Sequence, residues 1–335
     1  GIDKGKNELA EFKNCKAENV TVEISGSPSK FNNLYFGGLM GHTINDIVVE
    51  NCSVTGCDFL IGGKSNTMYV GGLVGGCTEG GTIKNSFVKE TSIVVEAPWY
   101  TTTFGSMTGT SAVQLGGLIG HFDSSGDRFI SYEASGEITS SYVSDSKISV
   151  SSSGSSLVGG LAGYFYGASI SQSYSCNNYV SGIYYDFGKQ YYTVGGLVAS
   201  AKNCAVTSCF SYGNNVFTAR KSSGYSVVSS SLVAGFIPSV NSVEANFCGV
   251  GMNEIAAKSS EADKLTDERL EEFMFGGTNL NCFVTSPLIA NNACNLEAVS
   301  ESLWYTPQEI KNKLNLTDEY WEFEAEKPPY LNIGK

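Results

Sequence analysis

The chain has 335 residues and a net charge of −12, and only 16 % of its residues are charged. It contains 39 Gly, 18 Tyr and 18 Phe. This composition is typical of an extended all-β protein, because Gly supplies positive φ at corners and short polar side chains satisfy the backbone of turns. A phosphate backbone would be repelled by the negative charge, so nucleic acid is not an expected partner. No run of 18 apolar residues is present, so no segment is expected to span a membrane.

The first repeats are expected to begin near Phe12 and Val22, and a Gly-Gly-Leu element then recurs along the chain. Its five clear copies are Gly37–Gly41, Gly71–Gly75, Gly116–Gly120, Gly159–Gly163 and Gly195–Ala199, and a decayed copy begins at Leu232. Successive leucines are separated by 34, 45, 43, 36 and 35 residues. A short apolar strand of this kind buries its face only against the same strand of the next repeat. The period therefore predicts a β-solenoid.

A second element follows each glycine-rich one, with an aliphatic residue, a small polar residue or Cys three positions later, and often an aromatic residue directly after that. Clear copies begin at Ile83, Ile138, Ile170 and Val206, and weaker ones at Phe12, Val49, Val243 and Asn279. The positions three residues later are Cys15, Cys52, Ser86, Ser141, Ser173, Cys209, Asn246 and Cys282. If each repeat lies on the next, these residues form a vertical ladder of small side chains. Each repeat is expected to form one three-faced coil, with two smaller coils as the alternative.

The ten cysteines are too sparse for a disulfide scaffold and lack the paired spacing of a zinc site. Several share the ladder position, so we interpret them mainly as small apolar side chains stacked on their neighbours. Disulfide pairing of some of them stays open.

Residues 71 to 88 join the two elements as Gly-Gly-Leu-Val-Gly followed by Gly-Thr-Ile-Lys-Asn-Ser-Phe-Val. In this the chain resembles the GLUG repeat of bacterial surface proteins, over roughly residues 36 to 250. The resemblance implies an extracellular parallel β-helix, or β-solenoid, found in adhesin-like proteins and as a non-catalytic region of some secreted proteases. It transfers no catalytic residues to this chain.

The two longest spacings place inserts near residues 96 to 113 and 122 to 136. In the first insert, Trp99, Tyr100 and Phe104 lie in a Thr-rich loop. Exposed aromatic side chains on a rigid scaffold commonly bind sugars or proteins, so these three residues are candidate binding residues. The alternative is that Trp99 folds back onto the flank of the solenoid.

The second insert carries the acidic residues Asp123, Asp127, Glu133 and Glu137. We interpret them as a solvated segment rather than as the converging carboxylates of a polysaccharide-cleaving β-helix enzyme. The two histidines, His42 and His121, share one repeat slot, which favours a stacked or exposed repeat position over a metal ligand. No catalytic residue, metal site or cofactor is expected.

A tyrosine-rich segment at residues 183 to 192 is predicted to form a hairpin with its tip near residues 187 and 188. Its candidate residues are Tyr184, Tyr185, Tyr191 and Tyr192. Ordinary cross-strand pairs would explain them, and an aromatic recognition patch is the functional alternative. Tyr164 and Tyr166, which follow a neighbouring Gly-Gly-Leu element, could extend such a patch.

Near the C-terminus, Thr266 followed by two acidic residues predicts a short helix at about 266–275. A capping box at Thr306 with Pro307 after it predicts a second helix at about 307–314. Segments 321–324 and 329–333 have the alternation of closing strands. We therefore divide the chain into a solenoid of about eight degenerate repeats, 1–295, and a helix-plus-strand (α+β) cap, 296–335, over its last open edge.

Together these features favour an extracellular, adhesin-like binding module without catalysis. It would present a rigid solenoid flank and aromatic inserts to a glycan or to a host or matrix protein. The start at Gly1 is interpreted as a processed or trimmed end of a secreted or cell-surface protein whose signal segment is not part of this chain. The alternatives are a structural spacer of a larger surface protein and a carbohydrate-active β-helix enzyme.

Overall fold

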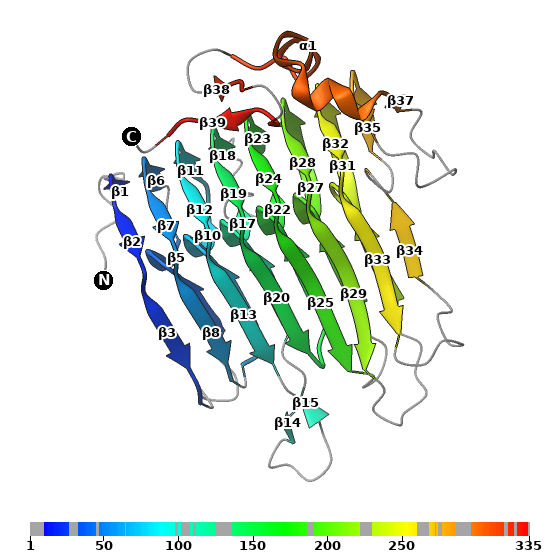
Figure 1. The fold of residues 1–335 in the computed structure, drawn as a ribbon. Helices are drawn as coiled ribbons and strands as arrows, with labels where there is room; N and C mark the ends of the chain where they lie inside the picture. The colour runs from blue at the N-terminus through cyan, green and yellow to red at the C-terminus, as the bar shows by residue number, and fades with distance from the viewer. Residues whose placement is uncertain are drawn as a thin grey trace.

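The computed structural model describes residues 10–26, 33–44, 47–63, 65–97, 100–101, 108–109, 112–124, 136–185, 191–221, 230–259, 268–271, 273, 277–285, 296–317, 321–324 and 327–333. These residues form a parallel β-solenoid in which the strands of successive coils lie side by side (Figure 1). Each repeat makes one coil, because the N–H of Leu73 donates to the carbonyl oxygen of Leu118, and that of Leu118 to Leu161. In the described part of the chain, no helix has the length and apolar character needed to cross a membrane.

Each coil passes through sheet 1 and then through the two arms of sheet 2, which β27 joins into one 12-stranded sheet. Sheet 1 contains β4 (Leu34–Gly37), β9 (Thr67–Gly71), β16 (Ala112–Gly116), β21 (Ser156–Gly159), β26 (Tyr191–Gly195), β30 (Ser230–Ala234) and β34 (Glu268–Glu271). The leading arm of sheet 2 contains β5 (Met40–Thr43), β10 (Val74–Thr78), β17 (Ile119–Asp123), β22 (Ala162–Tyr166) and the first half of β27 (Val198–Thr207). The trailing arm contains β1 (Ala10–Lys13), β6 (Ile47–Glu50), β11 (Gly81–Lys84), β18 (Gly136–Thr139), β23 (Ser169–Ser171), the second half of β27, and β35 (Thr278–Leu280). The long β31 (Ser239–Asn246) pairs with both halves of β27.

Sheets 3 and 4 complete the coil. Sheet 3 contains β2 (Lys16–Glu18), β7 (Ser53–Thr55), β12 (Phe87–Lys89), β19 (Tyr142–Ser144), β24 (Tyr174–Cys176), β28 (Phe210–Tyr212), β32 (Gly249–Gly251), β36 (Phe283–Val284) and β37 (Glu297–Ala298). Sheet 4 contains β3 (Thr21–Ile24), β8 (Asp58–Gly62), β13 (Ser92–Ala97), β20 (Lys147–Ser152), β25 (Tyr179–Tyr185), β29 (Asn215–Lys221) and β33 (Glu254–Ser259). The expectation of one coil per repeat is confirmed, but each coil has five strand positions instead of three faces.

The glycine-rich element lies where sheet 1 meets the leading arm, and there the backbones of neighbouring coils touch. Its second glycine recurs in six copies, at Gly38, Gly72, Gly117, Gly160, Gly196 and Gly235. In the last copy the N–H of Leu197 donates to the carbonyl oxygen of Phe236, so the element reads Ala234-Gly235-Phe236-Ile237. The leucine position of this copy is therefore Phe236, and its prediction at Leu232 is wrong by four residues.

The core consists of apolar side chains stacked in register from coil to coil. Val49, Ile83, Ile138, Ile170 and Val206 form one such row, and all five are buried. Burial of each large aliphatic side chain contributes about 1.5–3 kcal/mol, so the rows are the main source of stability.

The next residue of this row is not the one that the sequence pattern predicted. The strand pairing places Ala245 beside Val206, so the copy does not begin at Val243. Two residues separate the predicted and observed registers, and the ladder position is Cys248 in place of Asn246.

The predicted ladder of small side chains is present, with the corrected members Cys15, Cys52, Ser86, Ser141, Ser173, Cys209, Cys248 and Cys282. It lies at the corner between the trailing arm and sheet 3. In each coil the residue before the ladder position has positive φ, as at Asn51 and Asn85. The side-chain oxygens accept N–H groups from the previous coil, for example Ser86 Oγ from Cys52 at 3.1 Å.

The cysteine thiols in this ladder donate to backbone carbonyl oxygens, and the nine described cysteines form no disulfide. Burial raises the pKa of the Cys248 thiol well above its usual value, and it raises that of Cys204 to about 12. Such thiols stay protonated at neutral pH and are poor nucleophiles. Their role in the coil is packing and hydrogen bonding.

A second ladder, which the sequence analysis missed, lies five residues further on at the corner between sheets 3 and 4. Its members are Cys57, Thr91, Ser146, Asn178, Asn214 and Asn253. Asn214 is buried, and its Oδ1 accepts the N–H of Asn178 at 2.8 Å. Its amide nitrogen donates to the carbonyl oxygen of Ser175 and to Ser211 Oγ. The ladder thus satisfies buried polar groups at a corner where strands cannot pair.

Asn214→Ala is expected to lower the free energy of unfolding by about 2–3 kcal/mol, because buried groups of Asn178 and Ser175 lose their partners. The matched control is Asn215→Ala, since Asn215 lies next in sequence but points outward and donates to the exposed Glu254. We expect this control to change stability by less than about 0.5 kcal/mol. Urea unfolding followed by circular dichroism measures both variants. Equal losses would contradict the assigned role of the second ladder.

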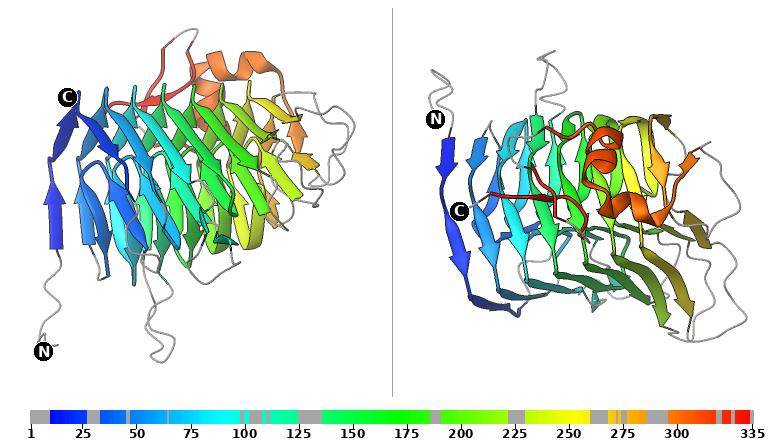
Figure 2. Two further views of the ribbon diagram at one scale, coloured as in Figure 1. Left: turned by 90° about the horizontal axis from the view of Figure 1, so that it is seen from below. Right: turned by 45° about the horizontal axis from the view of Figure 1, so that its top comes forward.

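The C-terminal strap, which is described at residues 299–317, 321–324 and 327–333, lies along the outward face of sheet 3 and crosses several coils (Figure 2, right). It contains η1 (Glu301–Tyr305), α1 (Pro307–Lys313) and the antiparallel pair β38 (Trp321–Glu322) and β39 (Tyr330–Leu331). Beneath it the rings of Phe87, Tyr142, Tyr174 and Phe210 stack at 4.8–4.9 Å between centroids. Trp304 packs on Phe210, Tyr212 and Phe283.

The helix and the closing strands of the strap are as predicted, but two details differ. The described part of the strap packs along the flank of the stack and not across its last open edge, because the aromatic residues of sheet 3 offer it an apolar surface. Thr306 makes no capping hydrogen bond to the helix, since its hydroxyl donates to the carbonyl oxygen of Ser302 instead.

The predicted helix near 266–275 is wrong where the structure describes it, because residues 268 to 271 form β34. This strand pairs in parallel with β30. The buried ring of Phe273 stacks on Phe236 at 4.7 Å. Pairing with the neighbouring coil therefore outweighs the local capping signal at Thr266.

Candidate functional site

The described residues of the tyrosine-rich segment, 183–185 and 191–192, do not pair as a hairpin, because they belong to different sheets, and the predicted tip near residues 187 and 188 lies outside the described residues. Tyr184 is the second-last residue of β25 in sheet 4, and Tyr192 is the second residue of β26 in sheet 1. Both side chains are buried inside the coil and their rings stack at 4.2 Å. They are removed from the candidate binding residues, since a ligand at the surface does not reach them.

Tyr185 and Tyr191 lie at the surface. Tyr185 accepts a hydrogen bond from Ser151 at 3.5 Å, and Tyr191 has an exposed fraction of 55 %. In the first insert, Tyr100 lies in β14 (Tyr100–Thr101), which pairs with β15 (Thr108–Gly109). Trp99 and Phe104 lie outside the described residues.

Tyr164 and Tyr166 lie on the outward face of β22 and end a continuous row of rings. This outer aromatic row consists, in spatial order, of His42, Tyr35, Tyr69, His121, Tyr164 and Tyr166. Consecutive ring centroids are 3.9–6.5 Å apart, and all six side chains are half-buried. The row runs from sheet 1 onto the leading arm, along the axis of the stack.

The two histidines occupy the predicted common repeat slot, because His121 pairs with Gly76 in one direction and with Tyr164 in the other. His121 donates from Nδ1 to Gln114 Oε1 at 2.7 Å. Burial lowers the pKa of His121 to about 4, although the carboxylate of Asp123 opposes this. The imidazole is therefore neutral at physiological pH and serves as a stacked ring.

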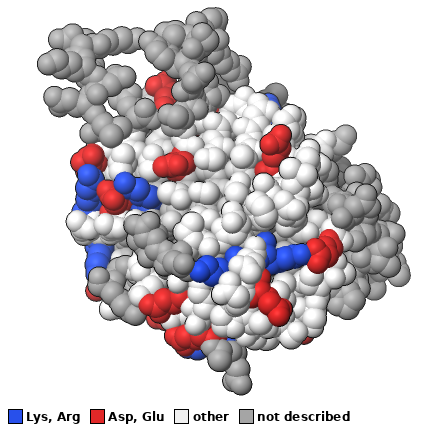
Figure 3. Space-filling model, turned by 90° about the horizontal axis from the view of Figure 1, so that it is seen from above, with Lys and Arg blue, Asp and Glu red and all other residues white. Residues whose placement is uncertain are grey.

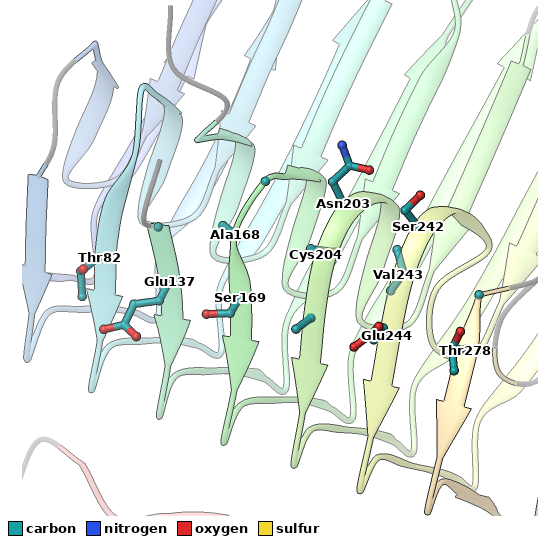
Figure 4. A pocket seen from close by; sticks show the side chains of 14 residues that line it. Thr82, Glu137, Ala168, Ser169, Asn203, Cys204, Ser242, Val243, Glu244 and Thr278 are labelled. Carbon is teal, nitrogen blue, oxygen red and sulfur yellow. The ribbon is translucent and has the colours of Figure 1, made fainter. Parts of the chain in front are cut away.

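A groove of about 740 Å³ follows the bend between the two arms of sheet 2 (Figure 4). The chain turns there at residues with positive φ, which are Gly167, Asn203 and Ser242 in successive coils. The groove wall is a row of outward side chains from six neighbouring strands: Thr82, Glu137, Ser169, Ala205, Glu244 and Thr278. The outer aromatic row reaches the rim, where Asn203 donates to the hydroxyl of Tyr166 at 3.4 Å.

The groove is polar and weakly acidic. Glu137 and Glu244 are exposed, and no Lys or Arg is among the described residues that line it. Lys202, beside the rim, lies with Nζ 5.0 Å from the ring centroid of Tyr166. Charges are also sparse and mixed in sign over the described surface seen from above (Figure 3).

The spacing of the two carboxylates in the groove does not suit glycoside hydrolysis. Glu137 on β18 and Glu244 on β31 are separated by three strand spacings, or about 14 Å. Paired catalytic carboxylates lie about 5–10 Å apart. Among the described residues, no cluster of three or more His, Cys, Asp and Glu could hold a metal ion. The arrangement offers hydrogen bonds and ring surface, which suit binding.

Sequence reasoning found Tyr164 and Tyr166 but not the groove beside them. The signal was present, because each residue of the groove wall directly precedes the first residue of the second element, as Glu137 precedes Ile138. What the pattern lacked was the bend between the arms, which turns this outward row into a groove.

No family model matches the chain, and no curated protein matches it in sequence. Among solved structures, one similar chain is described as a putative immunoglobulin A1 protease from Bacteroides ovatus. The TM-score is 0.54 at 13 % sequence identity, and the alignment covers 89 % of this chain and 86 % of the other. At this identity the likeness concerns the fold alone.

Proposed function

We propose that the chain is an extracellular, adhesin-like recognition module of the GLUG-repeat kind, secreted or held at the cell surface. It presents its solenoid flank to a glycan or to a host or matrix protein and performs no catalysis. The observation that carries this proposal is the outer aromatic row, which a rigid stack of coils holds beside a polar groove. Rigid aromatic side chains bind at a small cost in conformational entropy.

A structural spacer is the second reading, and a carbohydrate-active enzyme is the third. A spacer needs no ordered row of half-buried rings on one face. An enzyme needs converging catalytic groups, and the distance between Glu137 and Glu244 argues against such a pair in the groove. The name of the Bacteroides ovatus neighbour does not decide between these readings.

The purified chain should bind specific spots on an array of glycans and matrix proteins, and the Tyr164→Ala/Tyr166→Ala variant should lose that binding by about tenfold or more. Tyr305→Ala is the control, because this exposed tyrosine lies on the strap. Circular dichroism would verify that both variants keep the β-solenoid. Absence of any binding by the folded wild-type chain would favour the spacer.

A further inference from the structure

The groove between the arms of sheet 2 has a regular geometry along the axis of the stack. Its six wall residues come from six adjacent strands in one register, so the groove extends over five strand spacings, or about 24 Å. Glu137, Ser169 and Glu244 lie on different strands along the groove (Figure 4). A ligand that uses all of it must be elongated and must lie across the strands.

We infer that this groove binds a neutral, linear polysaccharide laid along the solenoid axis, which gives the proposed recognition function a ligand class. An extended peptide is a poorer occupant, because it would bind by adding a strand to a free sheet edge. The inner strands β18, β23 and β27 are paired on both sides and offer no such edge. A glycan chain needs no free backbone groups from its partner.

The side chains of the groove are suited to both the hydroxyl groups and the C–H groups of a pyranose ring. The hydroxyls of Thr82, Ser169 and Thr278 and the carboxylates of Glu137 and Glu244 can bind sugar hydroxyls. Ala168 and Ala205 line the same groove and can contact sugar C–H groups, and the buried side chains of Cys204 and Val243 lie beneath them. Because a 1,4-linked unit advances a glycan chain by roughly one strand spacing of about 4.8 Å, each coil can meet one unit.

Charge narrows the ligand class to neutral glycans. The two glutamates would repel sulfate or uronate groups, and the described lining residues include no cation to hold them. Lys202 lies over the ring of Tyr166, at the rim. Within the groove itself, the two glutamates therefore select against polyanionic polysaccharides.

The test is calorimetric titration of the full chain with hexasaccharides of 1,4-linked glucose, xylose, mannose and N-acetylglucosamine. At least one should bind, its affinity should rise with length up to about five or six units, and a hexamer of galacturonate should not bind. Ala205→Trp fills the centre of the groove and should weaken binding by about tenfold or more. Ala219→Trp is the matched control, since Ala219 is on the outward face of sheet 4 in the same coil and should leave the affinity unchanged.

The outcomes separate this inference from the proposed function. If no neutral hexasaccharide binds, or if Ala205→Trp binds as tightly as the wild-type chain, the groove is not a glycan site. Array binding that persists in Ala205→Trp would still support a recognition module with its site elsewhere. Loss of binding in both tryptophan variants would indicate a general change in the fold and would also count against the groove.

Discussion

Replacing Gly117 with alanine is expected to lower the apparent free energy of unfolding by about 3 kcal/mol or more. A Cβ on Gly117 would lie 2.2 Å from the carbonyl oxygen of Gly160 and 2.7 Å from Val143 Cγ1. The φ angle of Gly117 is not positive, so a left-handed backbone is not the reason for glycine at this position. Glycine is needed there because a Cβ atom would not fit. The clash involves the backbone of the next coil, where relaxation would break the hydrogen bond that the N–H of Gly117 donates to the carbonyl oxygen of Gly159.

The matched control for this change is Gly41→Ala. A Cβ on Gly41 would lie 3.1 Å from the carbonyl oxygen of Tyr35, a tight but tolerable contact, and alanine already stands at the equivalent position 199. We expect this variant to lose less than about 1 kcal/mol. Urea denaturation followed by far-ultraviolet circular dichroism measures both. Similar stabilities of the two variants would show that the second glycine does not fix the distance between coils.

Replacing Trp304 with alanine is expected to release the C-terminal strap from sheet 3. Trp304 is fully buried, its Nε1 donates to Thr285 Oγ1 at 2.9 Å, and its ring packs on Phe210, Tyr212 and Phe283. Loss of a buried tryptophan costs about 3–5 kcal/mol. Because each 1.4 kcal/mol is tenfold in an equilibrium constant, the open population should rise by about a hundredfold or more.

Limited proteolysis with mass spectrometry measures this opening as the rate of cleavage between residues 299 and 333. Tyr305→Ala is the control, because the exposed Tyr305 loses only its hydrogen bond to Tyr212, which is worth about 1 kcal/mol. Cleavage of the Trp304 variant at the wild-type rate would show that other contacts hold the strap.

The solenoid could be predicted because the residues that form each coil lie close together in the sequence and recur in every repeat. The glycine pair, the aliphatic residue and the small ladder residue recur together, and their spacing gives the stacking directly. Prediction failed where a copy had decayed. Around Leu232 and Val243 several apolar residues fit the pattern, and only the pairing with the previous coil, as in the hydrogen bond from Leu197 to Phe236, fixes the register.

The path of the strap and the groove could not be predicted, because both depend on surfaces that form only after the coils stack. Trp304 lies against Gly251, where an added Cβ would be 2.2 Å from Trp304 Nε1. No local pattern around either residue indicates this contact. Likewise Tyr184 and Tyr192 look like surface residues in sequence, but the corner between sheets 4 and 1 places both rings inside the coil.

The two anchor contacts of the strap also limit the number of coils that can lie between them. The strap is anchored at Thr285 through Trp304 and, on an earlier coil, at Gln172, whose Oε1 accepts the Nε1–H of Trp321 at 2.7 Å. These coils are three strand spacings apart, or about 14 Å, and one added coil would move the anchors apart by about 4.8 Å. Duplication or loss of a repeat between Gln172 and Thr285 would therefore break one of the two anchor contacts. The number of repeats on the N-terminal side can vary without affecting either contact.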